Sequence, residues 1–418
     1  MAQVVLTISR AEDWNTVMQQ AKEQLALGNA VTVKQTAPLV FGAGVIPMVE
    51  LSTDPDRPAE NFTYDGQGNM IWFKGANLLD IWAPGSSSDW SRWSLALMPA
   101  GVQLDNYDPN YGFSLIYKIG LSGRYLLWKP AKGSLSVGLR YAATFRARAT
   151  NGTSANTFTF NLLDSTGAVQ ATVTPSISLN SDFQVVQATF PNLSSALDNF
   201  QYKVAISDNS VVPEIREPWF GISDVMPPSD NYGFGVSGLS MFGYLKDSTI
   251  KHVYIKWANF AYPYNVANPT QIYGGVLARG MENCTVLNVQ FEGCQPPMTY
   301  YTGLIAGRAV NVNVRLVKAI DSAIIRPETN VILSAGTGAP SAGGLFGLAI
   351  APIEIYDADL TVDFYTYLRT AQRSYNGGLI GILVKTQYPV TIKRVATYPR
   401  FYENSGDSQN DALIGVMI

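Results

Sequence analysis

A short glycine motif recurs through the C-terminal part of the chain. In each copy a small residue is followed by two large apolar residues and another small residue. The copies are Gly238–Gly243, Gly274–Ala278, Gly303–Gly307, Gly343–Gly347, Gly377–Gly381 and Asp411–Gly415, with alanine replacing the second glycine of the pair in the last. Successive copies lie 28 to 41 residues apart. A period of this size predicts an architecture of stacked repeats, which offers long surfaces for binding.

A second pattern follows each motif and indicates the kind of repeat. In the run from Val310 to Leu316, valine and leucine alternate with asparagine and arginine. Strict alternation of this kind is typical of a half-buried β-strand. With two or three strands in each repeat and no helical segment, the pattern predicts a β-solenoid. A β-propeller or a sandwich with coincidental glycine pairs is the alternative.

Residues 231–418 resemble the glycine-leucine-glycine (GLUG-type) repeats and the pectin-lyase-like β-helices. The resemblance rests on cores such as Gly377–Gly381, each followed by a valine- and isoleucine-rich strand. The spacing of the copies varies more than in a regular adhesin array. Such repeats occur in bacterial surface adhesins and in phage tail fibres and tailspikes. The resemblance therefore implies a scaffold with a role in surface recognition, without implying an activity.

Residues 90–230 show a different β pattern. In Tyr141–Ala149 the odd positions are apolar, whereas Thr144, Arg146 and Arg148 point to the other side, and turn signals such as Asp164–Gly167 separate the strands. This spacing predicts a β-sandwich. The order of features, from the tyrosine-led strand to the closing Trp219–Val225, resembles jelly-roll carbohydrate-binding modules. Trp90, Trp93 and Trp128 form a candidate aromatic cluster on this domain, although core packing is the alternative for them.

The N-terminal region is distinct again. Ser9 and Glu12 match a capping box that opens a helix over Ala11–Leu27, with strands on both sides. We predict a small α+β domain over residues 1–60, which by analogy with fibres would attach the protein to a particle. Residues 61–89 are predicted to form a linker or packed extended segment, because turn formers dominate up to residue 70 and the apolar run Met70–Trp82 needs a partner.

Composition excludes several functional classes. The net charge of −3 provides no basic surface for nucleic acid, and no apolar run reaches the length of a membrane span. The chain contains one histidine, His252, and two cysteines, so we expect no metal site and no cofactor. Cys284 and Cys294 are predicted to be buried thiols, with a disulfide as the alternative. The N-terminus lacks the pattern of a secretory signal, which is consistent with synthesis in a host cytoplasm.

Paired carboxylates are the remaining route to catalysis, because glycoside hydrolysis needs two of them. The candidates within one repeat are Glu354, Asp357, Asp359 and Asp363, with Asp321 one repeat earlier. Aspartate is also a turn former, and Asp357 and Asp359 lie where the alternation changes phase. We therefore expect a protein without enzymatic activity.

Tyrosines give a better candidate for glycan binding. Several lie at equal offsets from the motif glycine, so stacked repeats would place them above one another. The candidates are Tyr262, Tyr264, Tyr273, Tyr300, Tyr301, Tyr367, Tyr375 and Tyr402. A tyrosine ring offers an apolar face and a polar rim to a sugar, but stacking among the rings alone also explains a ladder.

Together these features predict a phage-type virion protein, a tail fibre, tailspike or capsid-mounted fibre, that binds host surface polysaccharide. The fibre resemblance implies a homo-oligomer, with a trimer expected, and contacts to other virion proteins through the N-terminal domain. The chain ends within a repeat, whose uncovered strand edges also favour assembly. The alternatives are a depolymerase of the tailspike kind, a bacterial surface adhesin, and a capsid decoration protein without a receptor.

Overall fold

A computed structural model of the chain describes residues 1–42, 49–54, 57–75, 102–108, 112–117, 124–128, 134–149, 154–198, 200–206, 213–223, 240–258, 273–296, 299–326, 341–366, 374–403 and 408–418. Its contacts define two compact units. We call the first the stacked unit, which comprises Met1–Phe41, Val45–Lys74 and Gly235–Ile418. The second, the sandwich unit, comprises Gly42–Gly44 and Gly75–Phe234. Both units are built mainly from β-strands, as the sequence predicts.

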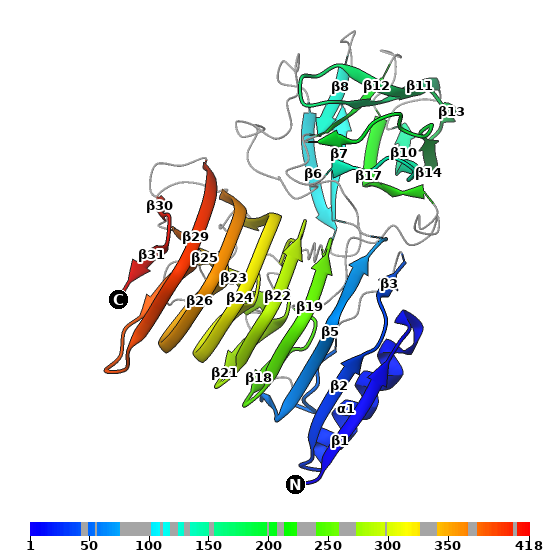
Figure 1. The fold of residues 1–418 in the computed structure, drawn as a ribbon. Coiled ribbons are helices and arrows are strands. Elements are labelled where there is room, and N and C mark those ends of the chain that lie inside the picture. The colour runs from blue at the N-terminus through cyan, green and yellow to red at the C-terminus, as the bar shows by residue number, and fades with distance from the viewer. Residues whose placement is uncertain are drawn as a thin grey trace. The chain divides into compact units, whose positions relative to one another are not determined.

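Parallel strands from successive repeats pair in register throughout the stacked unit (Figure 1). The first series is β20 (Tyr273–Gly275), β23 (Tyr301–Gly303), β25 (Ser341–Gly343), β27 (Ser374–Gly377) and β30 (Ser408–Asp411). The second series is β18 (Tyr244–Lys246), β21 (Ala278–Glu282), the starts of β24 (Ala306–Arg326) and β26 (Phe346–Thr366), then β28 (Ile380–Val384) and β31 (Ile414–Met417). The third series is β5 (Phe62–Phe73), β19 (Thr249–Lys256), β22 (Thr285–Glu292), the later parts of β24 and β26, and β29 (Val390–Glu403). We call one copy of the three strands a rung.

The glycine motif forms the turn between the first and second strands of a rung. Its two apolar residues point into the core, and Leu379 and Ile380 are fully buried. The glycines allow successive rungs to approach closely. A Cβ atom on Gly343 would lie 2.6 Å from the backbone nitrogen of Gly381, and one on Gly381 would lie 2.8 Å from the carbonyl oxygen of Ala342. Glycine therefore recurs at these positions because a side chain there would collide with the backbone.

Each strand of the third series bends at a residue with left-handed backbone geometry. These residues are His252, Asn288, Leu316, Asp357 and Arg394, whose φ angles are 52° to 58°. The pairing register skips each of them, so they form one column of corners along the stack. The phase change predicted at Asp357 is therefore a corner of the rung, and His252 also occupies one.

The N-terminal segment belongs to the stack, although the sequence predicts a separate domain over residues 1–60. Strands β1 (Gln3–Ile8), β2 (Ala30–Gln35) and β3 (Leu39–Phe41) join the sheet that contains β5, and β4 (Ala59–Glu60) pairs with β18. The helix forms as predicted, with η1 (Ala11–Asp13) leading into α1 (Trp14–Ala26). Its Trp14 is 1% exposed and contacts the rings of Phe41, Tyr64 and Phe242. The predicted capping box is wrong, since neither N-cap residue, Arg10 or Asp13, makes a side-chain cap hydrogen bond.

Of the two forms predicted for the segment after residue 60, a linker or a packed extended segment, the structure shows the packed one as far as Phe73. Phe62–Phe73 form β5, which pairs with β2 on one side and β19 on the other. Inside this strand Gln67 and Gly68 have φ angles of 52° and 79° and form its corner. The apolar run that follows is packed as predicted up to Phe73, and its later part lies outside the described residues.

The sandwich unit consists of antiparallel sheets, as predicted for residues 90–230. One sheet has the order β14 (Gln184–Thr189), β10 (Tyr141–Ala149), β17 (Pro213–Ile222), β7 (Gly112–Tyr117), β6 (Val102–Asp108). The other has the order β12 (Val169–Val173), β11 (Ser154–Leu163), β16 (Gln201–Ile206), β8 (Arg124–Trp128), with β13 (Ser176–Leu179) also on β11. A short pair joins β9 (Ser134–Leu135) to β15 (Leu197–Asp198). Phe145 of the first sheet packs against Phe158 and Phe160 of the second, which places the core between them.

Chain order shows where the sandwich is inserted. It follows β5, the third strand of its rung, and precedes β18, the second strand of the next. In later rungs the same connection is short, as between Glu292 of β22 and Tyr301 of β23. The sandwich therefore occupies a position in the repeat that elsewhere holds a loop.

Candidate functional site

The four carboxylates predicted as catalytic candidates lie on β26, and two of them are held by arginines of the next rung. Asp357 accepts two hydrogen bonds from Arg394, at 2.5 and 2.8 Å. Hydrogen bonding to Arg394 lowers the pKa of Asp357. Asp363 is buried and accepts two hydrogen bonds from Arg400, at 2.7 and 2.9 Å. Carboxylates held in this way suit cross-rung ion pairs better than proton donation to a leaving group.

The other two candidates are more exposed. Glu354 accepts a hydrogen bond from Asn313 at 2.6 Å and lies 4.0 Å from Arg315. Asp359 is exposed and occupies the register position next to Lys318. Asp321, the candidate from the preceding repeat, is exposed at a left-handed corner with a φ angle of 47°.

The tyrosine prediction has a mixed outcome. Tyr273 and Tyr301 occupy the same register position and stack, with ring centroids 5.4 Å apart. Tyr300 is 7% exposed and meets Tyr301 edge-on, which makes it a packing residue. Tyr375 occupies the same column, but Ser341 of the intervening rung interrupts the aromatic series. Tyr262, Tyr264 and Tyr367 lie outside the described residues, as does the side chain of Tyr402.

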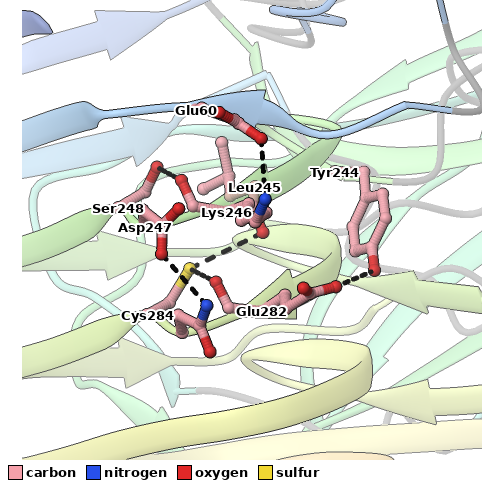
Figure 2. Close-up of polar contacts among 9 residues, drawn as sticks. Glu60, Tyr244, Leu245, Lys246, Asp247, Ser248, Glu282 and Cys284 are labelled. Atoms are coloured by element: carbon pink, nitrogen blue, oxygen red, sulfur yellow. Dashed lines mark hydrogen bonds and ion pairs between the residues drawn. The ribbon is translucent and has the colours of Figure 1, made fainter.

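Polar side chains also connect the rungs near β4, β18 and β21 (Figure 2). Lys246 donates to Glu60 at 2.8 Å, and Tyr244 donates to Glu282 at 3.3 Å. At the adjoining corner Asn283 donates to Asp247 at 3.1 Å, and Asn311 donates to Asn283 at 2.8 Å. Each contact joins successive rungs, so we interpret this region as structural.

Both cysteines are buried and neither forms a disulfide, which excludes the disulfide alternative. Cys284 points toward the backbone carbonyls of Leu245 and Glu282, at 3.6 and 3.2 Å from its sulfur atom. Burial raises the pKa of the Cys284 thiol to about 11. No group of three or more potential metal ligands occurs among the described residues. In the same part of the chain, no helix has the length and apolar character needed to cross a membrane.

The outer face of β10 in the sandwich unit carries a polar row. Phe145 and Ala147 face the core, whereas Thr144, Arg146 and Arg148 lie on the opposite side, as the alternation predicts. Thr144 is 1% exposed, and its hydroxyl makes no hydrogen bond in the described part of the chain. Its cross-strand neighbour Gln187 is exposed. A buried hydroxyl without a partner is unusual and indicates a place for a bound water.

The same row continues with an aromatic contact. The Arg148 guanidinium lies 4.6 Å above the centroid of the Phe183 ring, just before β14. The exposed part of the face therefore combines two guanidinium groups and an apolar ring, a mixture of groups found in small-molecule sites. Trp90 and Trp93, predicted to form an aromatic cluster here, lie outside the described residues, as does the side chain of Trp128.

A second mixed cluster, which sequence reasoning missed, lies on the outer face of the stacked unit. Trp72 of β5, Lys256 of β19 and Glu292 of β22 share one register position on three successive rungs. Trp257 meets Trp72 edge-on at 5.6 Å between ring centroids. The partners come from distant parts of the sequence, so no local pattern identifies the cluster. We call these four residues the tryptophan corner.

No family model matches the sequence, and the search of curated proteins also gives no match. Solved structures with partial similarity include an arabinose-bound MgGH51 α-L-arabinofuranosidase, at 13% identity over 37% of this chain and 27% of that chain, with a TM-score of 0.29. The C-terminal family 22 carbohydrate-binding module of Clostridium thermocellum Xyn10B aligns at 15% identity over 34% of this chain and 93% of that module, with a TM-score of 0.25. A xylan-binding module of Paenibacillus barcinonensis Xyn10C aligns at 12% identity over 37% and 94% of the two chains, with a TM-score of 0.24. Similarities this low carry no functional argument.

Proposed function

We propose that the protein is a structural and adhesive protein that binds glycans through the outer face of β10 and β14. The observation that carries this proposal is the contact between Arg148 and Phe183, two partly exposed side chains on the same face as the partly exposed Arg146. Guanidinium groups donate hydrogen bonds to sugar oxygens. Phe183 supplies an apolar surface for the C–H face of the sugar ring.

A glycan array with the purified full-length chain tests this proposal. We expect retention of wild-type protein on a subset of glycans, and at least a tenfold loss of affinity in Arg148→Met. Arg140→Met is the matched control, because Arg140 is exposed just before β10 and its replacement removes the same charge. Equal binding by both variants and the wild type would contradict the site. Failure of the wild type to bind any glycan would contradict the function.

The fibre character of the protein is part of the same proposal. The parallel rungs and their columns of corners support a β-solenoid, a stiff scaffold on which an inserted module can be displayed. Placement on a phage virion, attachment through the N-terminal residues and assembly as a trimer rest on the sequence resemblance alone. Light scattering at micromolar concentration tests the assembly, and a clean monomer would contradict it.

The proposal assigns binding without cleavage. The ion pairs of Asp357 and Asp363 with arginines favour this assignment, because both carboxylates have structural partners. Incubation of the protein with a polysaccharide that it retains on the array provides the test. We expect the chain length of the polysaccharide to stay constant, whereas shortened chains would favour the depolymerase alternative.

A further inference from the structure

The tryptophan corner begins with the pairing of β5, β19 and β22. Lys256 pairs in register with Trp72 on one side and Glu292 on the other. Neighbouring strands lie about 4.8 Å apart, so side chains at one register position contact each other on the same face. Trp72, Lys256 and Glu292 are all partly exposed. The three residues therefore form a continuous strip on the outer face of the stacked unit.

Trp257 closes one side of this strip. Its backbone is left-handed, with a φ angle of 59°, which turns the chain at the end of β19. On the next rung Gly293 occupies the corner, and a Cβ atom there would lie 2.8 Å from the Trp257 ring. The absence of a side chain at Gly293 therefore lets the indole pack down onto the backbone. The result is a pair of indole rings inclined at 70° to each other.

A charged pair lies against these rings. The Lys256 ammonium is 3.0 Å from the Glu292 carboxylate, and it lies 5.8 and 5.2 Å from the ring centroids of Trp72 and Trp257. The two charged side chains are only 24% and 29% exposed. Burial lowers the pKa of Lys256, and burial together with the charge of Asp321 raises that of Glu292. Both groups have thus lost part of their hydration, which makes them receptive to new hydrogen bonds.

Trp72 supplies the apolar surface of the corner. Its indole nitrogen is buried, whereas the residue as a whole is partly exposed. The corner therefore offers an aromatic ring beside an ammonium donor and a carboxylate acceptor. A ligand with one apolar face and several adjacent hydroxyls matches this set, and a pyranose ring has those properties.

We propose that the tryptophan corner is a second glycan subsite, specific for an uncharged hexose unit with vicinal hydroxyls. One hydroxyl would accept from Lys256 while its neighbour donates to Glu292, with the C–H face of the sugar against Trp72. The charges of Lys256 and Glu292 cancel, and the Lys74 ammonium, 5.9 Å from the Trp72 ring centroid, is balanced by Asp321 near Glu292. The subsite therefore has no net attraction for a sugar acid or an amino sugar. This inference rests on the proposed glycan-binding function but not on the site in the sandwich unit.

The test uses the full chain and neutral oligosaccharides of glucose, galactose and mannose, three to six units long, beside matched oligosaccharides that carry uronic acids. Two variants, Lys256→Met and Glu292→Gln, each remove one charge of the Lys256–Glu292 pair with little change in volume. A third, Trp72→Phe, reduces the aromatic surface of the corner. The control is Lys318→Met, because Lys318 is exposed on the same outer face. Thermal melting confirms folding, and tryptophan fluorescence reports occupancy of the corner.

We expect neutral oligosaccharides to bind and to change the fluorescence, with affinity reduced at least tenfold in Lys256→Met and Glu292→Gln and unchanged in Lys318→Met. If folded Lys256→Met and Glu292→Gln bind like the wild type while Arg148→Met does not, the second subsite is refuted and the proposed function stands. If they lose binding while Arg148→Met keeps it, the tryptophan corner holds and the sandwich site fails. Preference for the uronic acid series would refute the specificity, and absence of binding to either series would refute both proposals.

Discussion

Tyr273 and Tyr301 stack with their ring planes inclined by only 18°, because they occupy equivalent positions on two successive rungs. The next rung places buried Ser341 at this position, and the one after it places Tyr375 there. The predicted tyrosine ladder is therefore one stacked pair and one separate ring. Stacking between the first two rings explains their alignment without a ligand.

The pair has a measurable coupling. A double-mutant cycle of Tyr273→Ala and Tyr301→Ala should give an interaction free energy of about 0.5–1.5 kcal/mol, the usual value for an aromatic pair. The matched cycle of Tyr301→Ala and Tyr375→Ala should give a value near zero, because the Ser341 rung separates the rings. Urea unfolding of the variants supplies both free energies. A coupling of equal size in the two cycles would show that the column acts as a unit.

The glycine turns should tolerate no side chain. Gly343→Ala places a methyl group against the backbone of Phe346 and Gly381, so we expect a loss of about 3 kcal/mol or more in the free energy of unfolding. Gly42→Ala is the control, because a Cβ atom on Gly42 would meet no atom of the described residues within 4 Å, and it should change stability by less than about 0.5 kcal/mol. Unfolding in urea measures the free energy of unfolding of both variants. Equal melting of the two variants would show that the turn can relax.

The strands of the repeats could be predicted from the sequence because alternation and glycine spacing are local properties. The run Val310–Leu316 lies within β24, and the glycine cores form the turns between paired strands. The choice between a linker and a packed segment before residue 70 stayed open for an equally local reason. Glycine usually marks a loop, but in β5 Gln67 and Gly68 form a corner that the neighbouring strand β19 continues at His252.

The sites were less predictable because they depend on pairing between distant segments. Lys256 and Trp72 lie side by side because β19 pairs with β5, although the whole sandwich unit is inserted between these two strands in the sequence. The acidic cluster on β26, by contrast, could be located from the sequence. Its members were recognisable from spacing, yet Arg394 and Arg400 of the following rung make Asp357 and Asp363 ion-pair partners.

The N-terminal helix should be essential for the stacked unit. Trp14 is buried against rings from three segments, so Trp14→Ala should cost about 3–5 kcal/mol in the free energy of unfolding. The exposed Glu12 is the control, and Glu12→Ala should have little effect. Calorimetry follows the unfolding of both variants. A Trp14→Ala protein with the wild-type melting temperature would restore the interpretation of residues 1–60 as an independent domain.

The Cys284 thiol should be inert while the chain is folded. Its pKa of about 11, raised by burial, leaves almost no thiolate at pH 8, so iodoacetamide should react only after denaturation. The raised pKa also makes stability depend on pH. The folded state favours the protonated thiol, so Cys284 contributes to the free energy of unfolding. The contribution is complete below pH 9, the pKa of the thiol in the unfolded chain, and disappears as the pH rises to about 11. A shift of two units corresponds to about 3 kcal/mol.

Comparison with Cys284→Ala isolates this contribution from tyrosines that titrate in the same range. The difference in unfolding free energy between the wild type and Cys284→Ala should be constant from pH 7 to about 9 and should then fall toward pH 11, because only the wild type loses a proton that the fold retains. Guanidinium unfolding at each pH provides the values. Rapid alkylation of the native protein at pH 8, or a difference that does not change with pH, would contradict the burial of this thiol against the carbonyls of Leu245 and Glu282.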